Sequence, residues 1–286
     1  SYFGRINLSW ADKYLFEGNI RRDGSSRFHK DHRWGTFPSF SLGWRMSEEN
    51  FMKSIKWLDM LKLRLSWGAL GNNAVDNYEY QSVYNKDNYV LGNSVVPGLA
   101  QIQLANAMVS WETTYVTNIG LDFSLFGSKL DGTIELFNKD THDILIDLPA
   151  PLLVGNASIP TQNAARVRNR GVEMNLKWNH RIGKVNYFVG GNFTFIDNEV
   201  TRFKGEERSI SGTNMIQEGY PINIQYVLAV DRILQTDEDM LFVEKMIKDA
   251  PLDPTTGQRV NPFASYGTPK KGDFLSLIHI SEPTRL

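Results

Sequence analysis

The sequence contains no cysteine, no long hydrophobic run and no large excess of charge of either sign. The absence of cysteine excludes disulfides, cysteine nucleophiles and thiolate metal sites. No apolar run approaches the roughly 18 residues that a membrane-spanning helix needs. A net charge of -1 and a pI near 6.5 lack the basic excess typical of nucleic-acid-binding proteins, so we expect no nucleic-acid partner.

Aromatic residues are plentiful, with 7 Trp, 11 Tyr and 16 Phe in 286 residues. The mean hydropathy of -0.34 is typical of a soluble protein. Transmembrane β-barrels give similar values, because only every second residue of each strand faces lipid. They also carry aromatic side chains at both membrane interfaces, so the composition is compatible with a barrel.

Apolar residues recur at every second position in eight segments of the chain. In the first segment, Ile6, Leu8 and Trp10 alternate with Asn7 and Ser9. The other segments are residues 14–21, 39–46, 61–67, 118–125, 130–136, 171–178 and 186–195. This period of two predicts β-strands with one apolar and one polar face. Most segments with their flanks approach the 9–11 residues that a tilted transmembrane strand needs, against a mean of about 5–6 in soluble proteins.

The connections between these segments alternate in length. Residues 11–13, 127–129 and 181–184 form short connections, whereas those at 23–35, 69–112, 147–166 and after residue 197 are long. Short turns at one end and long loops at the other are typical of outer-membrane barrels. We therefore predict an all-β fold, a segment of an antiparallel up-and-down transmembrane β-barrel with eight or nine strands. A soluble β-sandwich that binds carbohydrate also alternates in this way and remains the alternative.

Four further segments have local signals. Residues 47–57 predict a short amphipathic helix, since Ser47 precedes acidic residues and apolar residues recur at helical spacing. Residues 222–234 predict a ninth strand. Thr236 predicts the N-cap of a helix that ends at Asp249, with Met240, Val243, Met246 and Ile247 as its apolar stripe. Residues 251–262 predict a loop.

The sequence contains no convincing catalytic, cofactor or metal constellation. His29 and His32 flank Asp31, but all three fall in a predicted surface loop. Aromatic residues of the long connections are better candidates, because their faces stack on sugar rings and provide a large contact area. The candidate ligand-contacting residues are Trp34, Tyr78, Tyr80, Tyr84 and Tyr89. Packing of the loops, or a place in the interfacial girdle, is the alternative role for each.

Several short motifs occur in an order that resembles the SusC/RagA family of TonB-dependent outer-membrane transporters. Each motif is weak alone, and their order and spacing carry the resemblance. They are Asp23-Gly24-Ser25-Ser26-Arg27-Phe28, Trp34-Gly35-Thr36-Phe37-Pro38-Ser39, Gly43-Trp44-Arg45, Leu61-Lys62-Leu63-Arg64, Trp67-Gly68, Gly71-Asn72, Trp111-Glu112, Asn118-Ile119-Gly120-Leu121-Asp122, Thr141, Asp143 and Asn169-Arg170-Gly171-Val172-Glu173.

The resemblance implies a barrel of about 22 strands with an N-terminal plug, of which this chain holds barrel strands and no plug. It implies a transporter and not an enzyme, placed in the Gram-negative outer membrane among lipid. Its implied partners are a SusD-like surface lipoprotein, the TonB energy-coupling protein, and a glycan or peptide ligand. A passive porin or a barrel enzyme is the alternative within the membrane class.

The resemblance also divides the chain. Residues 1–274 match a partial barrel domain, and the lack of a signal peptide before Ser1 predicts that the native N-terminus lies upstream. Residues 275–286 (LSLIHISEPTRL) resemble a translated sequencing-adapter sequence. We therefore expect this tail to be non-native and exclude it from the fold.

Overall fold

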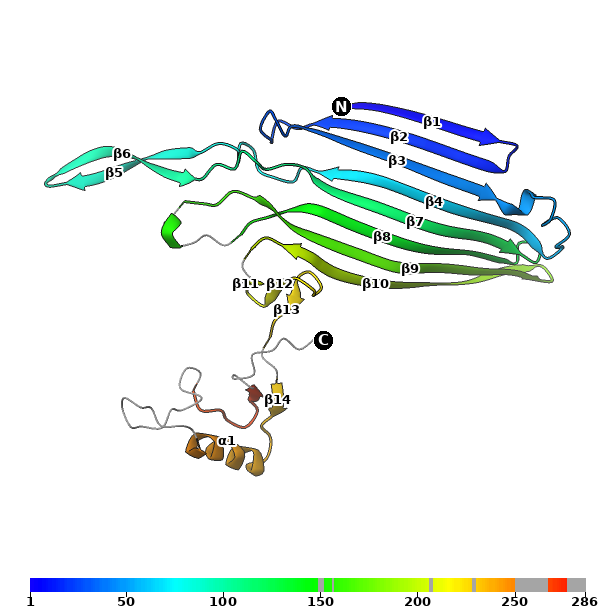
Figure 1. Ribbon diagram of the computed structural model, residues 1–286. Helices are drawn as coiled ribbons and strands as arrows, with labels where there is room; N and C mark the ends of the chain where they lie inside the picture. Colours follow the sequence, from blue (N-terminus) through cyan, green and yellow to red (C-terminus); the bar gives the residue numbers. More distant parts are fainter. Residues whose placement is uncertain (149–151, 156, 206–207, 228–229, 250–266, 277–286) are drawn as a thin grey trace. The chain divides into compact units, whose positions relative to one another are not determined.

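The computed structural model describes residues 1–148, 152–155, 157–205, 208–227, 230–249 and 267–276. Compact unit 1 comprises residues 1–209 and 215–224, and unit 2 comprises residues 210–214 and 225–286. Unit 1 contains an antiparallel eight-stranded sheet in the order β1-β2-β3-β4-β7-β8-β9-β10 (Figure 1). Its strands are β1 (Tyr2–Trp10), β2 (Tyr14–Gly24), β3 (Trp34–Arg45), β4 (Leu58–Asn72), β7 (Glu112–Leu125), β8 (Leu130–Ile146), β9 (Gln162–Ile182) and β10 (Val185–Phe203).

All eight predicted strands are present, and most are longer than their alternating segments. The segment 171–178, for example, is the centre of β9, which has 21 residues. The reason lies in the side chains at the strand ends. On β9 the positions in line with the apolar residues are taken at the outer end by Arg166, Arg168 and Arg170. The apolar alternation therefore stops there, while the backbone pairing continues.

Consecutive strands of the sheet form an up-and-down meander. Tight turns join β1 to β2, β7 to β8 and β9 to β10 at one end, and the long connections lie at the other end (Figure 1). Several turn residues have left-handed backbone conformations, including Ala11 (φ 52°), Phe126 (φ 61°) and Gly183 (φ 60°). The predicted sorting of short and long connections is confirmed.

The connection between β4 and β7 contains a separate two-stranded hairpin. Its strands are β5 (Val83–Leu91) and β6 (Ser94–Gln103), which pair with each other, and Gln103 of β6 also forms an isolated bridge with Ser158. In Figure 1 the hairpin extends past the ends of the long strands. The sequence predicts a single connection at 69–112, because no regular apolar alternation marks these strands, most of whose side chains are exposed.

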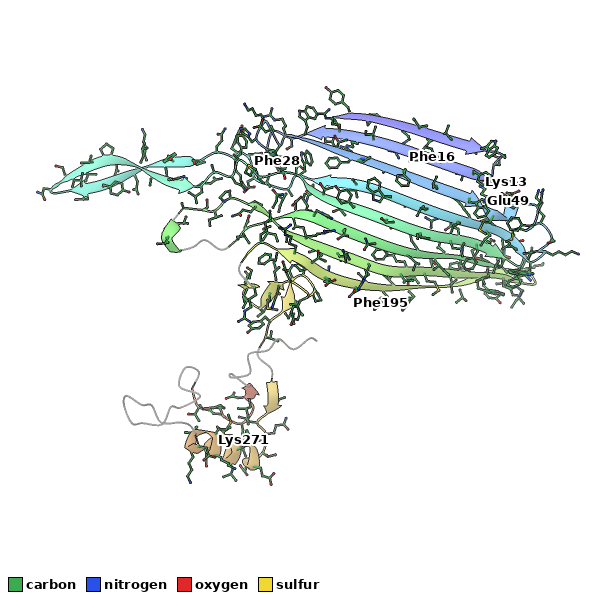
Figure 2. The ribbon with its side chains drawn as sticks, in the orientation of Figure 1. Lys13, Phe16, Phe28, Glu49, Phe195 and Lys271 are labelled. Carbon is green, nitrogen blue, oxygen red and sulfur yellow. The ribbon has the colours of Figure 1, made fainter. Side chains whose placement is uncertain are left out.

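The helix predicted at residues 47–57 is wrong. A 3-10 helix, η1 (Met46–Glu48), is followed by turns, and Glu49 has extended backbone angles. The Glu49 carboxylate accepts hydrogen bonds from Lys13 Nζ (3.0 Å), Tyr14 Oη (2.7 Å) and Trp44 Nε1 (3.3 Å). These contacts to the neighbouring turn and strands hold the backbone away from the helical path (Figure 2).

The predicted ninth strand at residues 222–234 is also wrong. The described residues of this segment form the short strands β13 (Ile224–Gln225) and β14 (Val230–Ile233), and neither belongs to the eight-stranded sheet. β14 pairs instead with β15 (Phe274–Ser276). The remaining short elements are η2 (Leu152–Val154), β11 (Arg208–Ser211) and β12 (Asn214–Gln217).

Unit 2 contains the predicted helix, α1 (Asp237–Asp249). Thr236 caps it, because Asp239 N donates to Thr236 Oγ1 at 3.2 Å and Thr236 N donates to Asp239 Oδ2 at 2.9 Å. The apolar stripe predicted for the helix is confirmed as well. It packs around Leu234, Val243 and Leu275, with contributions from Met240, Met246 and Ile247.

Two predictions about the C-terminal region are largely untested. The loop predicted at 251–262 lies outside the described residues. Of the tail predicted to be non-native, Leu275 and Ser276 belong to β15 and Leu275 is buried, while 277–286 are not described. The boundary at residue 274 therefore stays a prediction. Within the described residues, helices are too short or too polar to span a bilayer.

Candidate functional site

One face of the eight-stranded sheet is apolar across its whole width. The strand register places one residue from each strand in a continuous row, and alternation places a second such row nearby. The first row is Leu8, Phe16, Leu42, Leu65, Ile119, Leu136, Val172 and Phe195, and the second is Trp10, Tyr14, Trp44, Leu63, Leu121, Ile134, Met174 and Phe193. Figure 2 labels Phe16 and Phe195 of the first row.

Among the residues that the structure describes, no second layer of protein covers these apolar side chains. In the chain alone, Leu8 is 60%, Leu136 is 49% and Phe195 is 59% exposed. A soluble sandwich would bury such a face beneath another sheet. Two continuous apolar rows of this width far exceed the patches that soluble proteins tolerate, and hydrocarbon is the environment that they fit.

Aromatic side chains gather near both ends of this apolar face. Near the short turns, Trp10 and Tyr14 have ring centroids 5.6 Å apart, and Trp57 and Phe126 lie 6.1 Å apart. Toward the long-loop end the corresponding pairs are Tyr2–Trp34 (5.9 Å), Phe40–Trp67 (5.7 Å) and Trp67–Tyr115 (6.1 Å). Two aromatic groups flanking an apolar band are typical of membrane-interface girdles.

The apolar band runs diagonally across the strands. On β8, β9 and β10 its outermost residues at the loop end are Leu136, Val172 and Phe195, which share one row. On β2 the band extends past Phe16, which lies in the same row, through Gly18 to Ile20. Arg22 is the next residue on this face. A band that crosses the hydrogen-bonding rows obliquely corresponds to strands tilted against the membrane normal, as barrel closure requires.

The opposite face of the sheet is polar. One row near the short turns contains only polar residues, and in a barrel this face lines the lumen. That row is Arg45, Lys62, Asp122, Thr133, Asn175 and Asn192. The sheet thus separates an apolar from an aqueous environment, as a transmembrane wall does.

An arginine-centred network ties three strands together on the polar face. Arg64 Nε and Nη2 donate to the two carboxylate oxygens of Asp122 at 2.8 and 3.0 Å, and Nη2 also reaches Glu135 at 3.3 Å. Gly120 makes this geometry possible, because a Cβ atom there would lie 2.8 Å from Arg64 Nη2. This network was not predicted, although opposite charges at polar positions of neighbouring predicted strands were the available signal.

The long connections pack on a small core of their own. Phe28 comes from the connection between β2 and β3, and it is buried together with Val75 and Val109 from the two arms of the connection between β4 and β7, with Trp111 against them. The rings of Phe28 and Trp111 lie 5.4 Å apart. Buried Glu79 adds a polar tie, because its Oε2 accepts from Thr161 N at 3.0 Å. This core holds the long connections in defined positions at one end of the wall.

The candidate aromatic residues do not form one site. Tyr78 is 61% exposed, and Tyr80 lies beside it at 6.4 Å between ring centroids and 6.1 Å from His29. Tyr84 and Tyr89 belong to β5 of the hairpin and not to an irregular loop. The structure brings together Tyr78 and Tyr80 at the loop core, and it places the two hairpin tyrosines apart from the wall.

Trp34 differs from the tyrosines, because it is the first residue of β3 and not part of a loop. It pairs with Gly24 and stacks on Tyr2, on the same face as the apolar rows. The Arg22 guanidinium lies 5.4 Å from its ring centroid. This position favours the alternative role stated for it, that of an aromatic anchor at the membrane interface.

The histidines do not assemble a metal centre among the residues that the structure describes. His29 Nδ1 lies 3.1 Å from Asp31 Oδ2, and His32 joins no acidic cluster there. His142 packs edge-on against Tyr115 at 5.2 Å. The geometry therefore suits a wall with shaped loops.

Comparison with known proteins agrees with this geometry. The model of the family described as TonB dependent receptor-like, beta-barrel matches residues 1–228. The chain belongs to this family. Proteins of the family are transporters of the Gram-negative outer membrane and not enzymes, which agrees with the lipid-facing wall.

The chain is similar to much longer proteins. TonB-dependent receptor P39 of Formosa agariphila is 36% identical over 252 residues, which are 88% of this chain and 24% of the relative. TonB-dependent receptor SusC of Bacteroides thetaiotaomicron is 37% identical over 215 residues, 73% of this chain and 21% of the relative. The chain thus spans about a quarter of the length of these curated relatives.

Solved structures give the same picture. The RagAB peptide importer in the closed-closed state superposes with a TM-score of 0.72 and 26% identity, covering 90% of this chain and 28% of that chain. A second structure, of the RagAB peptide transporter, superposes with a TM-score of 0.69 and 28% identity, covering 77% of this chain and 24% of that chain. The long antiparallel strands accordingly match part of a SusC/RagA-like barrel.

Proposed function

We propose that this chain is a wall segment of an outer-membrane active transporter that imports oligosaccharides or peptides. The observation that carries the proposal is the two-faced sheet, with an apolar face of eight aligned strands and a polar face on the other side, in a member of the TonB-dependent receptor family. The wall separates lipid from a polar lumen, and the packed loops shape the space where a ligand enters.

The energy source follows from the family, whose members depend on TonB. The TonB protein of the inner membrane is therefore the expected energy-coupling partner of the complete transporter. A surface lipoprotein resembling SusD or RagB is the expected second partner, because two of the similar structures are of RagAB assemblies. A passive porin is the competing membrane function, and it differs in needing no energy input.

Uptake by cells tests this proposal. A strain that carries only the complete gene for this transporter is offered labelled oligosaccharides and labelled peptides, with and without a functional TonB. We expect uptake of one of these classes, and we expect it to stop when TonB is deleted. Equal uptake without TonB would establish a passive pore, and uptake of neither class would refute the assigned cargo.

We further propose that aromatic residues of the long connections contact the ligand, with Tyr78 and Tyr80 as the first candidates and the hairpin residues Tyr84 and Tyr89 after them. Trp34 lies on the lipid-side face and is assigned to the membrane interface instead. Exposure of Tyr78 beside the ordered loop core supports the choice, since stacking on a sugar or peptide needs a free ring face held in place. The double change of Tyr78→Ala and Tyr80→Ala should raise the KM for uptake. Tyr187→Ala, at the short-turn end of β10, is the matched control.

A further inference from the structure

A pocket lies where β8, β9 and β10 depart from regular pairing. The register shifts between Thr141 and Ile144 of β8, and again between Val200 and Arg202 of β10. β9 runs between these two irregularities with Arg166 at their level. Bulges re-aim side chains and are frequent at barrel rims and beside binding sites. Here they open a cavity of about 290 Å³.

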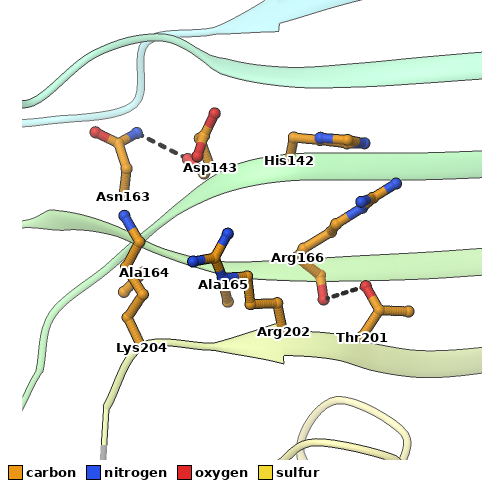
Figure 3. A pocket seen from close by; sticks show the side chains of 9 residues that line it. All are labelled: His142, Asp143, Asn163, Ala164, Ala165, Arg166, Thr201, Arg202 and Lys204. Carbon is orange, nitrogen blue, oxygen red and sulfur yellow. Dashed lines mark hydrogen bonds between the residues drawn. The ribbon is translucent and has the colours of Figure 1, made fainter.

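The pocket combines three cationic side chains with a floor of small residues. Ala164 and Ala165 are buried at its base. Arg166, Arg202, Lys204 and His142 surround them, and the acidic residue in the lining is Asp143 (Figure 3). The backbone is fixed by Thr201 Oγ1 donating to Arg166 O at 3.3 Å and by Asn163 Nδ2 donating to Asp143 O at 2.8 Å.

Two of these cations have no anionic partner among the residues that the structure describes. Arg166 lies 3.4 Å from Asp140, which also lies 3.5 Å from Arg168. Arg202 and Lys204 take part in no ion pair in the described part of the chain. The pocket therefore has an excess of positive charge, which suits a ligand with a phosphate group.

The strand register shows which side of the wall the cations occupy. Arg166 lies six residues beyond Val172 on β9, and Arg202 pairs with Arg166, so both share the face of the apolar rows. Arg170 and Arg168 occupy the two positions between Val172 and Arg166 on that face. A ladder of guanidinium groups thus begins directly where the lipid-facing band ends.

The height of this ladder corresponds to lipid headgroups. The ladder, from Arg170 to Arg166, lies two to six residues beyond Val172, which corresponds to about 7 to 20 Å along the strand. A strand tilt of about 45° reduces these values to about 5 to 14 Å above the hydrocarbon edge. An ordinary headgroup layer is about 5–8 Å thick on each side, so Arg170 lies level with it. Arg166 and Arg202 lie about 14 Å above the hydrocarbon edge, and long cationic side chains at that height can extend down to the outer edge of the layer.

We propose that this pocket binds a phosphate group of a phosphorylated glycolipid in the outer leaflet of the membrane, with Arg202 and Lys204 as the decisive contacts. The inference rests on the proposed function only in requiring that the chain forms part of an outer-membrane barrel. A phosphate held against Arg166, Arg202 and Lys204 would attach the glycolipid to the outside of the wall, away from the lumen.

Native mass spectrometry of the complete transporter in detergent tests the proposal. The probes are bisphosphorylated lipid A, the same lipid with both phosphates removed, and inorganic phosphate alone. The double variant Arg202→Gln and Lys204→Gln is compared with Arg181→Gln and Lys184→Gln, which removes the same charges at the short-turn end of β9 and β10. Heat-dependent gel mobility confirms that each variant is a folded barrel.

We expect wild type and the control variant to bind phosphorylated lipid A equally, and the pocket variant to bind it about tenfold or more weakly. Equal affinity of the pocket and control variants would overturn the proposal. So would equal binding of phosphorylated and dephosphorylated lipid by wild type, a comparison that needs no variant. A third outcome is that wild type and the control variant bind inorganic phosphate more tightly than the pocket variant, while none of them binds lipid A. This outcome would overturn the lipid site and assign a free-anion site instead.

The uptake assay separates this inference from the proposed function. The pocket variant should import its nutrient at the wild-type rate, because its changed residues lie outside the lumen. Loss of lipid binding by the pocket variant, together with normal uptake, supports both the lipid site and the proposed transport function. Absence of lipid binding in a wild-type protein that imports normally refutes the lipid site alone.

Discussion

Leu65 offers the sharpest test of the lipid-facing assignment. Its side chain lies between Leu42 and Ile119 in the first apolar row and is 38% exposed in the chain alone. The adjacent residue, Ser66, points to the polar face. Leu65→Arg and Ser66→Arg place the same side chain at neighbouring positions. The two variants therefore differ mainly in the face of the sheet that carries the arginine.

The expected cost follows from the position of Leu65 near the middle of the β4 part of the band. An arginine on the lipid face of a barrel costs about 2–4 kcal/mol near the bilayer midplane. This is about a 30- to 900-fold change in the folding equilibrium. Ser66→Arg should change the free energy of unfolding by less than about 0.5 kcal/mol, as usual for a solvated position.

The assay is folding of the complete transporter into phospholipid vesicles across a urea series, followed by gel mobility and tryptophan fluorescence. We expect a clear loss of stability for Leu65→Arg and a curve close to wild type for Ser66→Arg. Equal costs for the two variants would refute the assignment of faces. A larger cost for Ser66→Arg would reverse it.

Three other predictions concern the polar face, the short-turn end and the loop core. Gly120→Ala should displace the flexible Arg64 guanidinium from Asp122 and cost less than about 1 kcal/mol in a urea titration, and a loss of several kcal/mol would contradict this account of the network. The hydrogen bonds from Tyr14 and Lys13 lower the pKa of Glu49 from 4.5 to about 2, so its stabilisation is complete above pH 4.5 and is lost as the pH falls toward 2. Glu49→Gln should remove that acid dependence from limited proteolysis of residues 46–57, and an unchanged acid profile would contradict it. Phe28→Ala should cost about 3–5 kcal/mol locally, and hydrogen exchange in the long connections should rise while the strands stay protected.

The sequence was informative wherever the two faces of a strand differ in polarity. Residues 2–10 predicted β1 to the residue, since every second position there is apolar or glycine. The pattern failed at the outer ends of β9 and β10, where Arg168 and Asp197 occupy lipid-side positions above the band. Polarity alternation reports the environment of a strand and not its hydrogen bonding, so it stops at the membrane edge.

The local errors have a similar physical origin. Ser47 and the acidic residues after it satisfy the rules for a helix start, yet the contacts of Glu49 to Lys13 and Trp44 are made by residues distant in sequence. The pocket between the two bulges could not be predicted either, because a bulge depends on how neighbouring strands register. Trp34 was assigned to a loop since its strand begins beyond the regular alternation.

The meander described for unit 1 has a consequence for how the wall is built. Six of the seven strand pairings in the sheet join strands that are consecutive in the sequence, and only the β4–β7 pairing skips an insertion. Nearly every closure is therefore short, with a small entropic cost. The inserted hairpin is itself a local closure, so it folds its own residues and brings the ends of its connection closer. A chain of this topology can add strands one after another from either side, which suits assembly at a membrane where the growing sheet must never expose many unpaired backbone groups at once.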